Sequence, residues 1–127
     1  PDLGQADVLI AFERLEALRY AHFLKKDGVM IVNDLRMDPM PVSIGAAQYP
    51  ENIIENLKKK HQVISLDAQA LAKEIGNARV FNTIIIGVAA KRMDFAKEDW
   101  LKVIEETVPQ KTIEINTRAF EAGYALG

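Results

Sequence analysis

The sequence predicts an α/β fold, in which a parallel sheet is followed by a helical C-terminal portion. In residues 1–67, short runs of consecutive apolar residues alternate with segments whose apolar residues recur at helical spacing, which is the pattern of βαβαβ units. In residues 68–127, apolar residues recur at helical spacing through most of the segment. With 127 residues in all, the chain is expected to hold a single domain that consists of these two portions.

Three apolar runs are the expected strands of the sheet. The first, Asp7–Phe12, follows a turn-like run at Pro1–Gln5 and reads as buried on both faces, which indicates a strand near the centre of a parallel sheet. Val29–Asn33 has the same character. Gln62–Leu66 alternates more between apolar and polar residues, so we expect it nearer an edge of the sheet.

Two helices are expected between these strands. The first is Glu13–Leu24, and the second is roughly Glu51–Lys60, with Pro50 near its first turn. One stripe of the first helix is expected on its apolar face, and it consists of Leu15, Leu18 and His22. Gly28 is placed to end this helix in the left-handed conformation. Residues 34–41 contain two prolines and are predicted as a loop.

The first half of the helical portion contains one clear helix and one ambiguous segment. Asp67 is a good N-cap for a helix at Ala68–Ile75, and Gly76 is a good end for it. Arg79–Arg92 is apolar on every side, so periodicity does not decide its structure. Its three consecutive isoleucines favour a strand, whereas its length favours a buried helix.

Two amphipathic helices are expected to complete the chain, at Lys97–Thr107 and at about Gln110–Tyr124. The inner face of the first is expected to consist of Trp100, Val103 and Ile104. The apolar stripe of the second consists of Ile113, Thr117, Phe120 and Tyr124.

The composition excludes several functional classes. The chain has no cysteine, so these residues hold no disulfide, no cysteine nucleophile and no cysteine-ligated iron–sulfur cluster. A Ser–His–Asp triad would have to draw on only two histidines and two serines, and two isolated histidines do not close a structural zinc site. We assign no catalytic and no metal-binding residue. A net charge of −2 does not suit nucleic acid. The longest unbroken apolar run, Ile84–Ala90, is too short for a membrane span, so we expect a cytoplasmic protein.

The best-placed polar residues follow the first two predicted strands. Glu13 and Glu16 come after Asp7–Phe12, and Asn33 and Asp34 end or follow the second strand. Because the carboxyl ends of parallel strands form the ligand crevice of open α/β sheets, these four residues are candidates for binding a cofactor. The alternative is structural, since acidic residues suit helix N-termini and an Asn-Asp pair suits a loop.

Asn82 is the fifth candidate for cofactor binding. It lies within the apolar run, where a buried amide must find hydrogen-bond partners. The partner is either a neighbouring helix, another subunit or a ligand. Asn116, beside the apolar stripe of the last helix, leaves the same alternatives open. Gly87 is expected to let another backbone come close.

Five segments together resemble a known family. They are Ala6–Arg19 (ADVLIAFERLEALR), Leu24–Asn33 (LKKDGVMIVN), Tyr49–Ile53 (YPENI), Gly76–Asn82 (GNARVFN) and Glu114–Tyr124 (EINTRAFEAGY). In this order and spacing they resemble the gamma-type domain of 2-oxoacid:ferredoxin oxidoreductases, most of all those of the indolepyruvate type. The resemblance covers nearly the whole chain.

The resemblance implies a Rossmann-like fold in which residues 80–92 are helical. It implies an enzyme complex that oxidatively decarboxylates a 2-oxoacid to an acyl-coenzyme A, with ferredoxin as the electron acceptor. Thiamine diphosphate and iron–sulfur clusters would belong mainly to partner chains or domains, with coenzyme A on or with those chains, and none of these cofactors would bind this chain alone. This domain would contribute an interface, with contacts to coenzyme A or to a partner. The isolated chain is therefore expected to be inactive.

The chain departs from the family in lacking the Gly-rich βα turn that precedes the match in other members. We therefore expect an incomplete domain, in which a missing segment or a second chain covers the first strand and its apolar faces. A homo-oligomer is one form of that cover. Two other functions remain open: a stand-alone Rossmann-like module that binds a nucleotide or coenzyme without catalysis, and a purely structural interaction protein.

Overall fold

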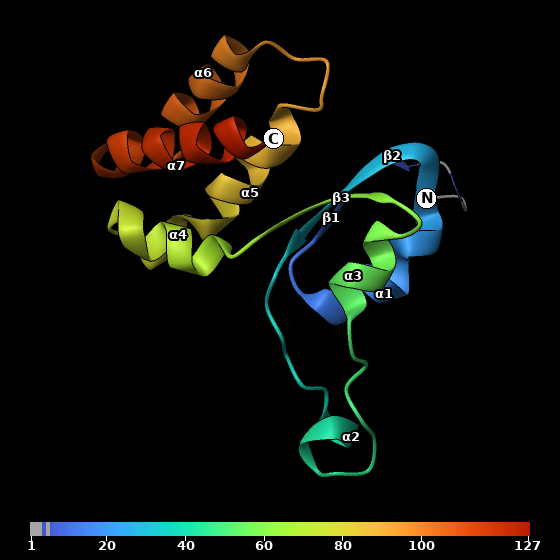
Figure 1. Cartoon of the computed structure of the whole chain (residues 1–127). Coiled ribbons are helices and arrows are strands. Elements are labelled where there is room, and N and C mark those ends of the chain that lie inside the picture. Colours follow the sequence, from blue (N-terminus) through green and yellow to red (C-terminus); the bar gives the residue numbers. More distant parts are fainter. Residues whose placement is uncertain (1–3, 5) are drawn as a thin grey trace. The chain divides into compact units, whose positions relative to one another are not determined.

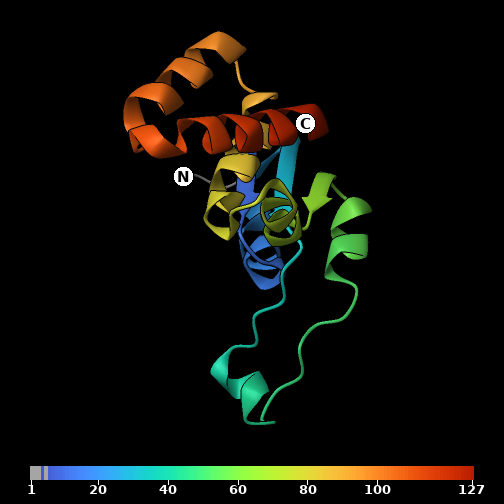
Figure 2. The same ribbon diagram turned by 90° about the vertical axis from the view of Figure 1, so that its left-hand side faces the viewer.

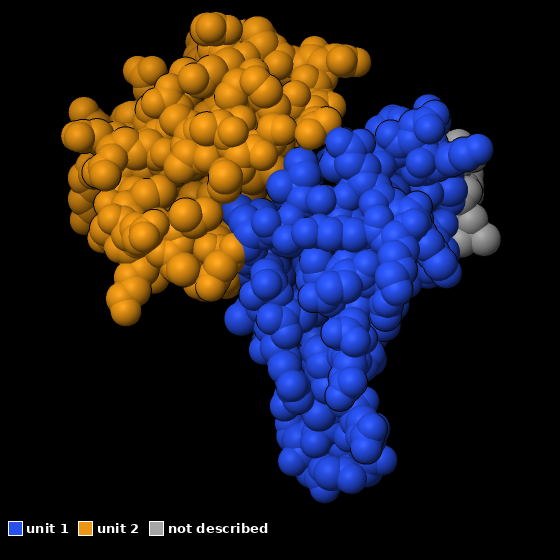
Figure 3. All heavy atoms as spheres, viewed as in Figure 1, with its two compact units in different colours: residues 1–66 blue, residues 67–127 orange. Residues whose placement is uncertain are grey.

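The computed structural model describes residue 4 and residues 6–127, and it divides the chain into two compact units, Pro1–Leu66 and Asp67–Gly127 (Figures 1 and 3). These are unit 1 and unit 2 below. Of the turn expected at Pro1–Gln5, only Gly4 lies among the described residues. None of the helices in residues 6–127 combines the length and the apolar character needed to cross a membrane.

Unit 1 is built on a three-stranded parallel sheet (Figure 1). The strands lie in the order β1-β2-β3, and both neighbouring pairs are parallel, which confirms the predicted α/β class. The elements of unit 1 are β1 (Ala6–Ala11), α1 (Arg14–Tyr20), a 3-10 turn (Ala21–Phe23), β2 (Leu24–Asn33), α2 (Met40–Ser43), α3 (Ile53–Lys58) and β3 (Gln62–Leu66).

The central strand of this sheet is β2, not β1. Residues Val29–Asn33 of β2 are at most 5% exposed, because strands lie on both sides of them. In the described sheet β1 has a neighbour on one side only, and Val8, Leu9 and Ile10 are half-buried. The prediction of β1 as a central strand is therefore wrong for the described sheet, whereas the edge position predicted for β3 is confirmed.

Helix α1 is shorter than the predicted Glu13–Leu24, because Leu24 already begins β2 and pairs with Ala6 of β1. Gly28 lies inside β2 and does not cap a helix. A Cβ at Gly28 would lie 2.9 Å from the carbonyl oxygens of both Ala6 and Asp7. Glycine is therefore required here because β1 and β2 approach closely where their register shifts.

The buried face of α1 is formed by alanine and not by the predicted stripe. Ala17 is fully buried in the unit 1 core, and Ala21 of the following turn packs against that core. Leu18 is 42% exposed and His22 is exposed, so their assignment to the buried face is wrong. Alanine contributes little to an apolar periodicity, and the pattern of larger residues therefore predicted the wrong side of the helix.

Helix α3 begins at Ile53, after an N-cap at Asn52 in the left-handed conformation (φ 57°). The predicted start at Glu51 is two residues early, because a left-handed residue cannot belong to a right-handed helix. Ile53 and Leu57 turn inward and join the core of unit 1, which also includes Met30 and Val32 of the central strand.

Unit 2 is helical, as predicted for this part of the chain. Its elements are α4 (Ala68–Ile75), a 3-10 turn (Ala78–Val80), α5 (Phe81–Ala90), α6 (Lys97–Thr107), a second 3-10 turn (Gln110–Thr112) and α7 (Ile113–Leu126). Both predicted caps of α4 are confirmed. The Asp67 carboxylate accepts a hydrogen bond from the Ala70 N–H at 3.0 Å, and Gly76 is left-handed with φ 118°.

Within the ambiguous segment Arg79–Arg92, Phe81–Ala90 forms helix α5, and two glycines explain how α5 packs against α7. A Cβ at Gly87 would fall on the carbonyl oxygen of Phe120, and a Cβ at Gly123 would fall on that of Ile84. The two helix backbones are therefore in direct contact, which confirms the close approach predicted at Gly87. Phe120, fully buried, lies in the core of unit 2.

The inner face of α6 differs in one residue from the prediction. Ile104 is 8% exposed and Trp100 is half-buried, but Val103 is 53% exposed. The side of α6 that packs into unit 2 is centred on Ile104 and includes Leu101. At 100° per residue, Val103 lies well to the other side of that centre.

Candidate functional site

Two of the predicted site residues, Glu13 and Glu16, hold the start of α1 at the carboxyl end of β1. The Glu13 carboxylate accepts hydrogen bonds from the Leu15 N–H at 2.9 Å and the Glu16 N–H at 2.5 Å. The Glu16 carboxylate accepts one from the Phe12 N–H at 2.7 Å. This arrangement resembles a capping box, except that Glu16 reaches the Phe12 N–H, one residue before the N-cap Glu13, so both carboxylates satisfy backbone donors at the start of α1.

Asn33 joins the ends of β1 and β2. Its side chain is fully buried, and its Nδ2 donates to the Phe12 carbonyl oxygen at 3.2 Å. Through this bond the last residue of β2 fixes the backbone that leads from β1 into α1. A buried amide that bonds to backbone in this way keeps its orientation, and here it sets the shape of the sheet edge.

Asp34, next in the chain, forms an ion pair with Arg14, whose Nε lies 2.5 Å from Oδ1. Both side chains are more than a third exposed, so solvent screens the pair. The backbone N–H of Asp34 donates to the Leu66 carbonyl oxygen at 2.7 Å, and the Arg14 N–H donates to Leu35 at 2.9 Å. These bonds position the chain where it leaves β2.

The structure therefore brings four of the five candidate residues together at the carboxyl ends of β1 and β2. The fifth, Asn82, belongs to unit 2, where it lies on the first turn of α5 and is exposed. The expectation of a buried amide at Asn82 is wrong. The buried-side polar contact of α5 is made instead by Thr83, whose hydroxyl donates to Oδ1 of Asn116 at 2.8 Å, so Asn116 bridges α7 to a neighbouring helix.

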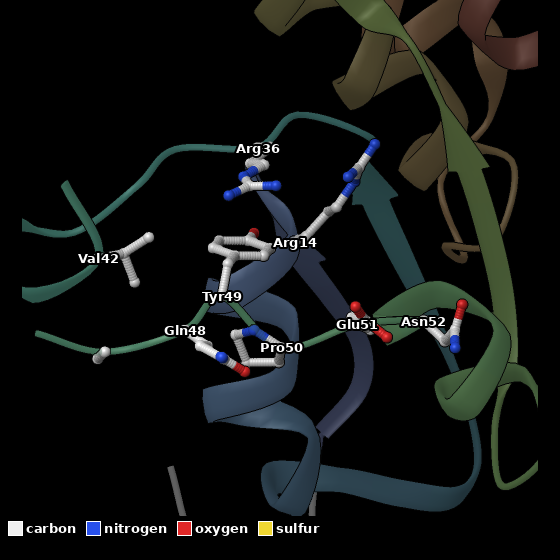
Figure 4. Close-up of a pocket in the computed structure, with 9 residues that line it drawn as sticks. Arg14, Arg36, Val42, Gln48, Tyr49, Pro50, Glu51 and Asn52 are labelled. Carbon is white, nitrogen blue, oxygen red and sulfur yellow. The ribbon is translucent and has the colours of Figure 1, made fainter. Parts of the chain in front are cut away.

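Two adjoining pockets, of about 620 Å³ and 380 Å³, lie beside this sheet edge (Figure 4). They share Arg14, Tyr49, Pro50 and Asn52. The larger pocket is also lined by Arg36 and Glu51. The smaller is also lined by Asp34, Glu55, Lys58 and Ser65. The larger pocket has two cations, Arg14 and Arg36, against one carboxylate, whereas the smaller has two of each. The excess of cations in the larger pocket favours an anionic group there.

Tyr49 is the central side chain of the larger pocket. Figure 4 shows its ring between Arg36 and Pro50, and the Arg36 guanidinium lies 4.4 Å from the ring centroid. This cation–π contact closes the base of the segment between β2 and α3. Among the described residues the Tyr49 hydroxyl oxygen is buried without a hydrogen-bond partner.

Burial raises the pKa of the Tyr49 hydroxyl above its ordinary value. The carboxylates of Glu13 and Asp38 raise that pKa further, and the guanidinium groups of Arg14 and Arg36 oppose them. The pKa of Arg36 is also raised, first by its hydrogen bond to Asp38, whose Oδ1 lies 2.6 Å from Nε. Tyr49 therefore enters the pocket as a neutral hydroxyl at physiological pH.

Sequence reasoning found the sheet edge but not the side chains opposite it. Arg36, Tyr49 and Asn52 lie on a segment that folds back to the edge only through contacts distant in sequence. One signal was present, since Tyr49 and Pro50 belong to a segment that carried the family resemblance. Among the described residues there is no group of three His, Asp or Glu side chains that could hold a metal ion.

The chain is similar to known proteins over nearly its whole length. It is 39% identical over 128 residues to the indolepyruvate oxidoreductase subunit IorB of Thermococcus kodakarensis, and the match covers 94% of this chain and 62% of that protein. It is 37% identical over 126 residues to IorB of Archaeoglobus fulgidus, covering 95% of this chain and 63% of that protein. The chain thus spans about three-fifths of the length of these curated relatives.

Two solved structures share the fold. The gamma subunit of a keto/oxoacid ferredoxin oxidoreductase from Geobacter sulfurreducens matches with a TM-score of 0.70 at 24% identity, over 97% of this chain and 64% of that one. The pyruvate oxidoreductase subunit PORC from Thermotoga maritima matches with a TM-score of 0.66 at 23% identity, again over 97% and 64%. Residues 1–126 match the pyruvate ferredoxin/flavodoxin oxidoreductase family, and the chain belongs to that family.

Proposed function

We propose that this chain is part of a subunit of a 2-oxoacid:ferredoxin oxidoreductase of the indolepyruvate type. In the proposed reaction, a 2-oxoacid such as indolepyruvate or another arylpyruvate loses CO2. Its acyl group passes to the coenzyme A thiol, and two electrons pass to ferredoxin. The observation that carries this proposal is the 39% identity, over 94% of the chain, to a protein named as an indolepyruvate oxidoreductase subunit.

The cofactors of that reaction are proposed to lie on a partner subunit. Iron–sulfur clusters do not fit these 127 residues, because cysteine thiolates are their usual ligands and the chain has none.

The proposed contribution of this chain is therefore binding and positioning. The carboxylates of Glu13 and Glu16 are engaged by backbone donors, and Asp34 by Arg14. Such groups set the shape of the sheet edge, and none of them is held as a free acid or base. A direct role of Glu13, Glu16, Asn33, Asp34 or Asn82 in binding a cofactor stays a prediction, as does the cytoplasmic location.

Co-expression tests this function. The full-length protein, carrying an affinity tag, is produced with the subunit that binds thiamine diphosphate, and the purified material is assayed for ferredoxin reduction. We expect the two subunits to co-purify in a fixed ratio and indolepyruvate with coenzyme A to give a higher kcat/KM than pyruvate. A complex that prefers pyruvate would overturn the oxoacid assignment alone, and the absence of any complex would overturn the subunit assignment.

The two pockets at the sheet edge favour a second function, namely the binding of a nucleotide or coenzyme by this chain itself. Calorimetry of the full-length protein with coenzyme A, NAD and FAD distinguishes the two functions. The control is Arg14→Ala, because Arg14 lines both pockets. If the wild type binds one of these ligands and the Arg14→Ala variant does not, the second function is supported. The first function predicts that neither the wild type nor the variant binds them tightly.

A further inference from the structure

The segment between β2 and α3 projects from unit 1. We call residues 34–52 the arm. It carries α2 at its tip, and Figures 1 and 2 both show that tip clear of the sheet and of α1 and α3. Three large apolar side chains of the arm are strongly exposed: Met37 at 60%, Met40 at 71% and Ile44 at 69%. Exposed apolar groups gathered on one projecting element mark an interaction surface.

The arm is also uncharged along its outer part. Every residue from Pro39 to Pro50 lacks a charged side chain, although 27% of the whole chain is charged. Of the charged residues that flank this part, Arg36 and Asp38 form an ion pair at 2.6 Å on one side, and Glu51 follows it on the other. A segment that met only water would gain solubility from charged residues, so this composition fits a surface that is buried in an assembly.

Hydrogen bonds hold the tip of the arm in one shape. The Val42 and Ser43 N–H groups both donate to the Pro39 carbonyl oxygen at 3.0 Å. The Ala46 and Ala47 N–H groups donate to the Pro41 carbonyl oxygen at 2.8 and 3.0 Å. A tip that is already folded loses little conformational entropy on binding, which favours docking as a rigid element.

The base of the arm is fixed as well. Arg36 on the outgoing strand of the arm stacks on Tyr49 of the returning strand, at 4.4 Å from the ring centroid. On the body of unit 1, the Arg14 N–H bonds to the Leu35 carbonyl oxygen at 2.9 Å, and Arg14 Nε pairs with Asp34. These contacts fix the position of the arm relative to the sheet edge.

We infer that the arm inserts its uncharged tip into an apolar groove of a different subunit of the oxidoreductase complex. This inference rests on the proposed function. A groove free of unpaired charge is the matching acceptor, because burying a charge against Met40 and Ile44 would leave it without a partner. The arm then sets the position of unit 1 on its partner subunit.

The size of the arm argues against a second copy of this chain as the occupant. A stable two-fold dimer buries about 800 Å² on each partner. Three apolar side chains bury on the order of a few hundred Å², so two arms packed against each other fall well short of that area. In the proposed complex, the arm lies in a groove of a different subunit, and further contacts between these two subunits add to the buried area. That complex therefore does not depend on the area of the arm alone.

The test compares two charged tip variants with a matched control. Met40→Glu and Ile44→Lys each place a charge on the tip, and Val103→Lys places one on α6, where Val103 is also exposed at 53%. All are made in the full-length protein, and affinity for the thiamine-binding subunit is measured by interferometry. Circular dichroism and Tm check folding, and a milder Met40→Ser variant keeps the test valid if a charged variant fails to fold.

We expect the tip variants to bind the partner subunit at least about tenfold more weakly than the wild type, because a few central apolar anchors dominate an interface. Val103→Lys should bind like the wild type. Unchanged affinity of the tip variants would overturn this inference while leaving the proposed function standing. Wild-type protein that binds no such subunit would overturn both. A wild-type homodimer that Ile44→Lys dissociates would identify a second copy as the occupant and contradict the inference.

Discussion

At the carboxyl end of β1, Glu13 and Glu16 are committed to backbone donors within one turn of chain. Three N–H groups, those of Phe12, Leu15 and Glu16, donate to the two carboxylates at 2.5–2.9 Å. The first N–H groups of any helix lack intrahelical acceptors, so a carboxylate at this position accepts hydrogen bonds from them. Those bonds compete with any bond from the carboxylate to a ligand. The same location in the fold thus invites two interpretations, and the hydrogen bonds favour the structural one.

Replacing Glu13 tests this interpretation at the level of stability. Glu13→Ala removes both acceptors from the start of α1 and should lower the free energy of unfolding by about 1 kcal/mol. Glu51→Ala, an exposed carboxylate nearby, should change it by less than about half that amount. Urea denaturation measures both variants. Equal stability of Glu13→Ala and the wild type would mean that the cap contributes nothing.

Tyr49 gives a prediction of pH dependence. Burial raises its pKa in the folded state, so the neutral hydroxyl is favoured by folding. The stabilisation from this group is fully present below the pKa of an unfolded tyrosine, about 10, and is lost as pH rises through the higher folded pKa. The difference in tyrosinate absorbance between the wild type and Tyr49→Phe isolates its titration. A midpoint at or below that of a model tyrosine would contradict the account.

At the scale of the element, the contact between α5 and α7 depends on the absence of side chains at Gly87 and Gly123. Most apolar contacts in unit 2 can adjust by changing rotamers, but at these glycines the neighbours are backbone carbonyls that cannot yield. The crossing is therefore the least tolerant part of the helical unit.

Gly123→Ala should destabilise unit 2 by about 1–3 kcal/mol, because its Cβ would overlap the Ile84 carbonyl oxygen. Helix propensity acts in the opposite direction, since alanine is favoured over glycine by about 1 kcal/mol in a helix. Ala125→Gly, at an exposed position of the same helix, measures that propensity alone. If thermal unfolding shows Gly123→Ala to be more stable than the wild type, the two helices do not meet as closely as described.

The elements that sequence predicted well are those with local signals. The bounds of β3 and α4 were correct, and the helix that includes Asp67 and Gly76 as caps needs no tertiary information. The boundary between α1 and β2 was missed, because Leu24 joins the sheet through its pairing with Ala6. No pattern within α1 indicates that pairing.

The candidate site also has one part that the sequence predicts and another part that depends on tertiary contacts. The position of the sheet edge was predictable, because the carboxyl ends of parallel strands lie at the same edge of a sheet. Arg36 and Tyr49 reach that edge only because the arm turns back at its tip, and their contact joins residues far apart in the chain. Asn82 was misplaced because its neighbours are apolar, yet its own position on α5 faces outward.

At the scale of the whole molecule, three features of the chain bear on the proposed function. It spans about three-fifths of its curated relatives. It lacks cysteine, its polar edge is internally bonded, and the two most exposed large apolar side chains of the described residues, Met40 and Ile44, lie on the uncharged outer part of the arm. These features are consistent with a subunit whose chemistry is carried out by cofactors on another chain.

In the proposed function, this protein is necessary for the oxidoreductase, and a partner subunit holds the reacting groups. The most direct test of this proposal is a titration, in which the full-length protein is added to a fixed amount of the thiamine-binding subunit with indolepyruvate, coenzyme A and ferredoxin present. The account predicts no ferredoxin reduction by the full-length protein alone, and a rate that rises with added protein to a plateau at a fixed stoichiometry. Reduction by the full-length protein alone, or a rate from the other subunit that the addition leaves unchanged, would contradict it.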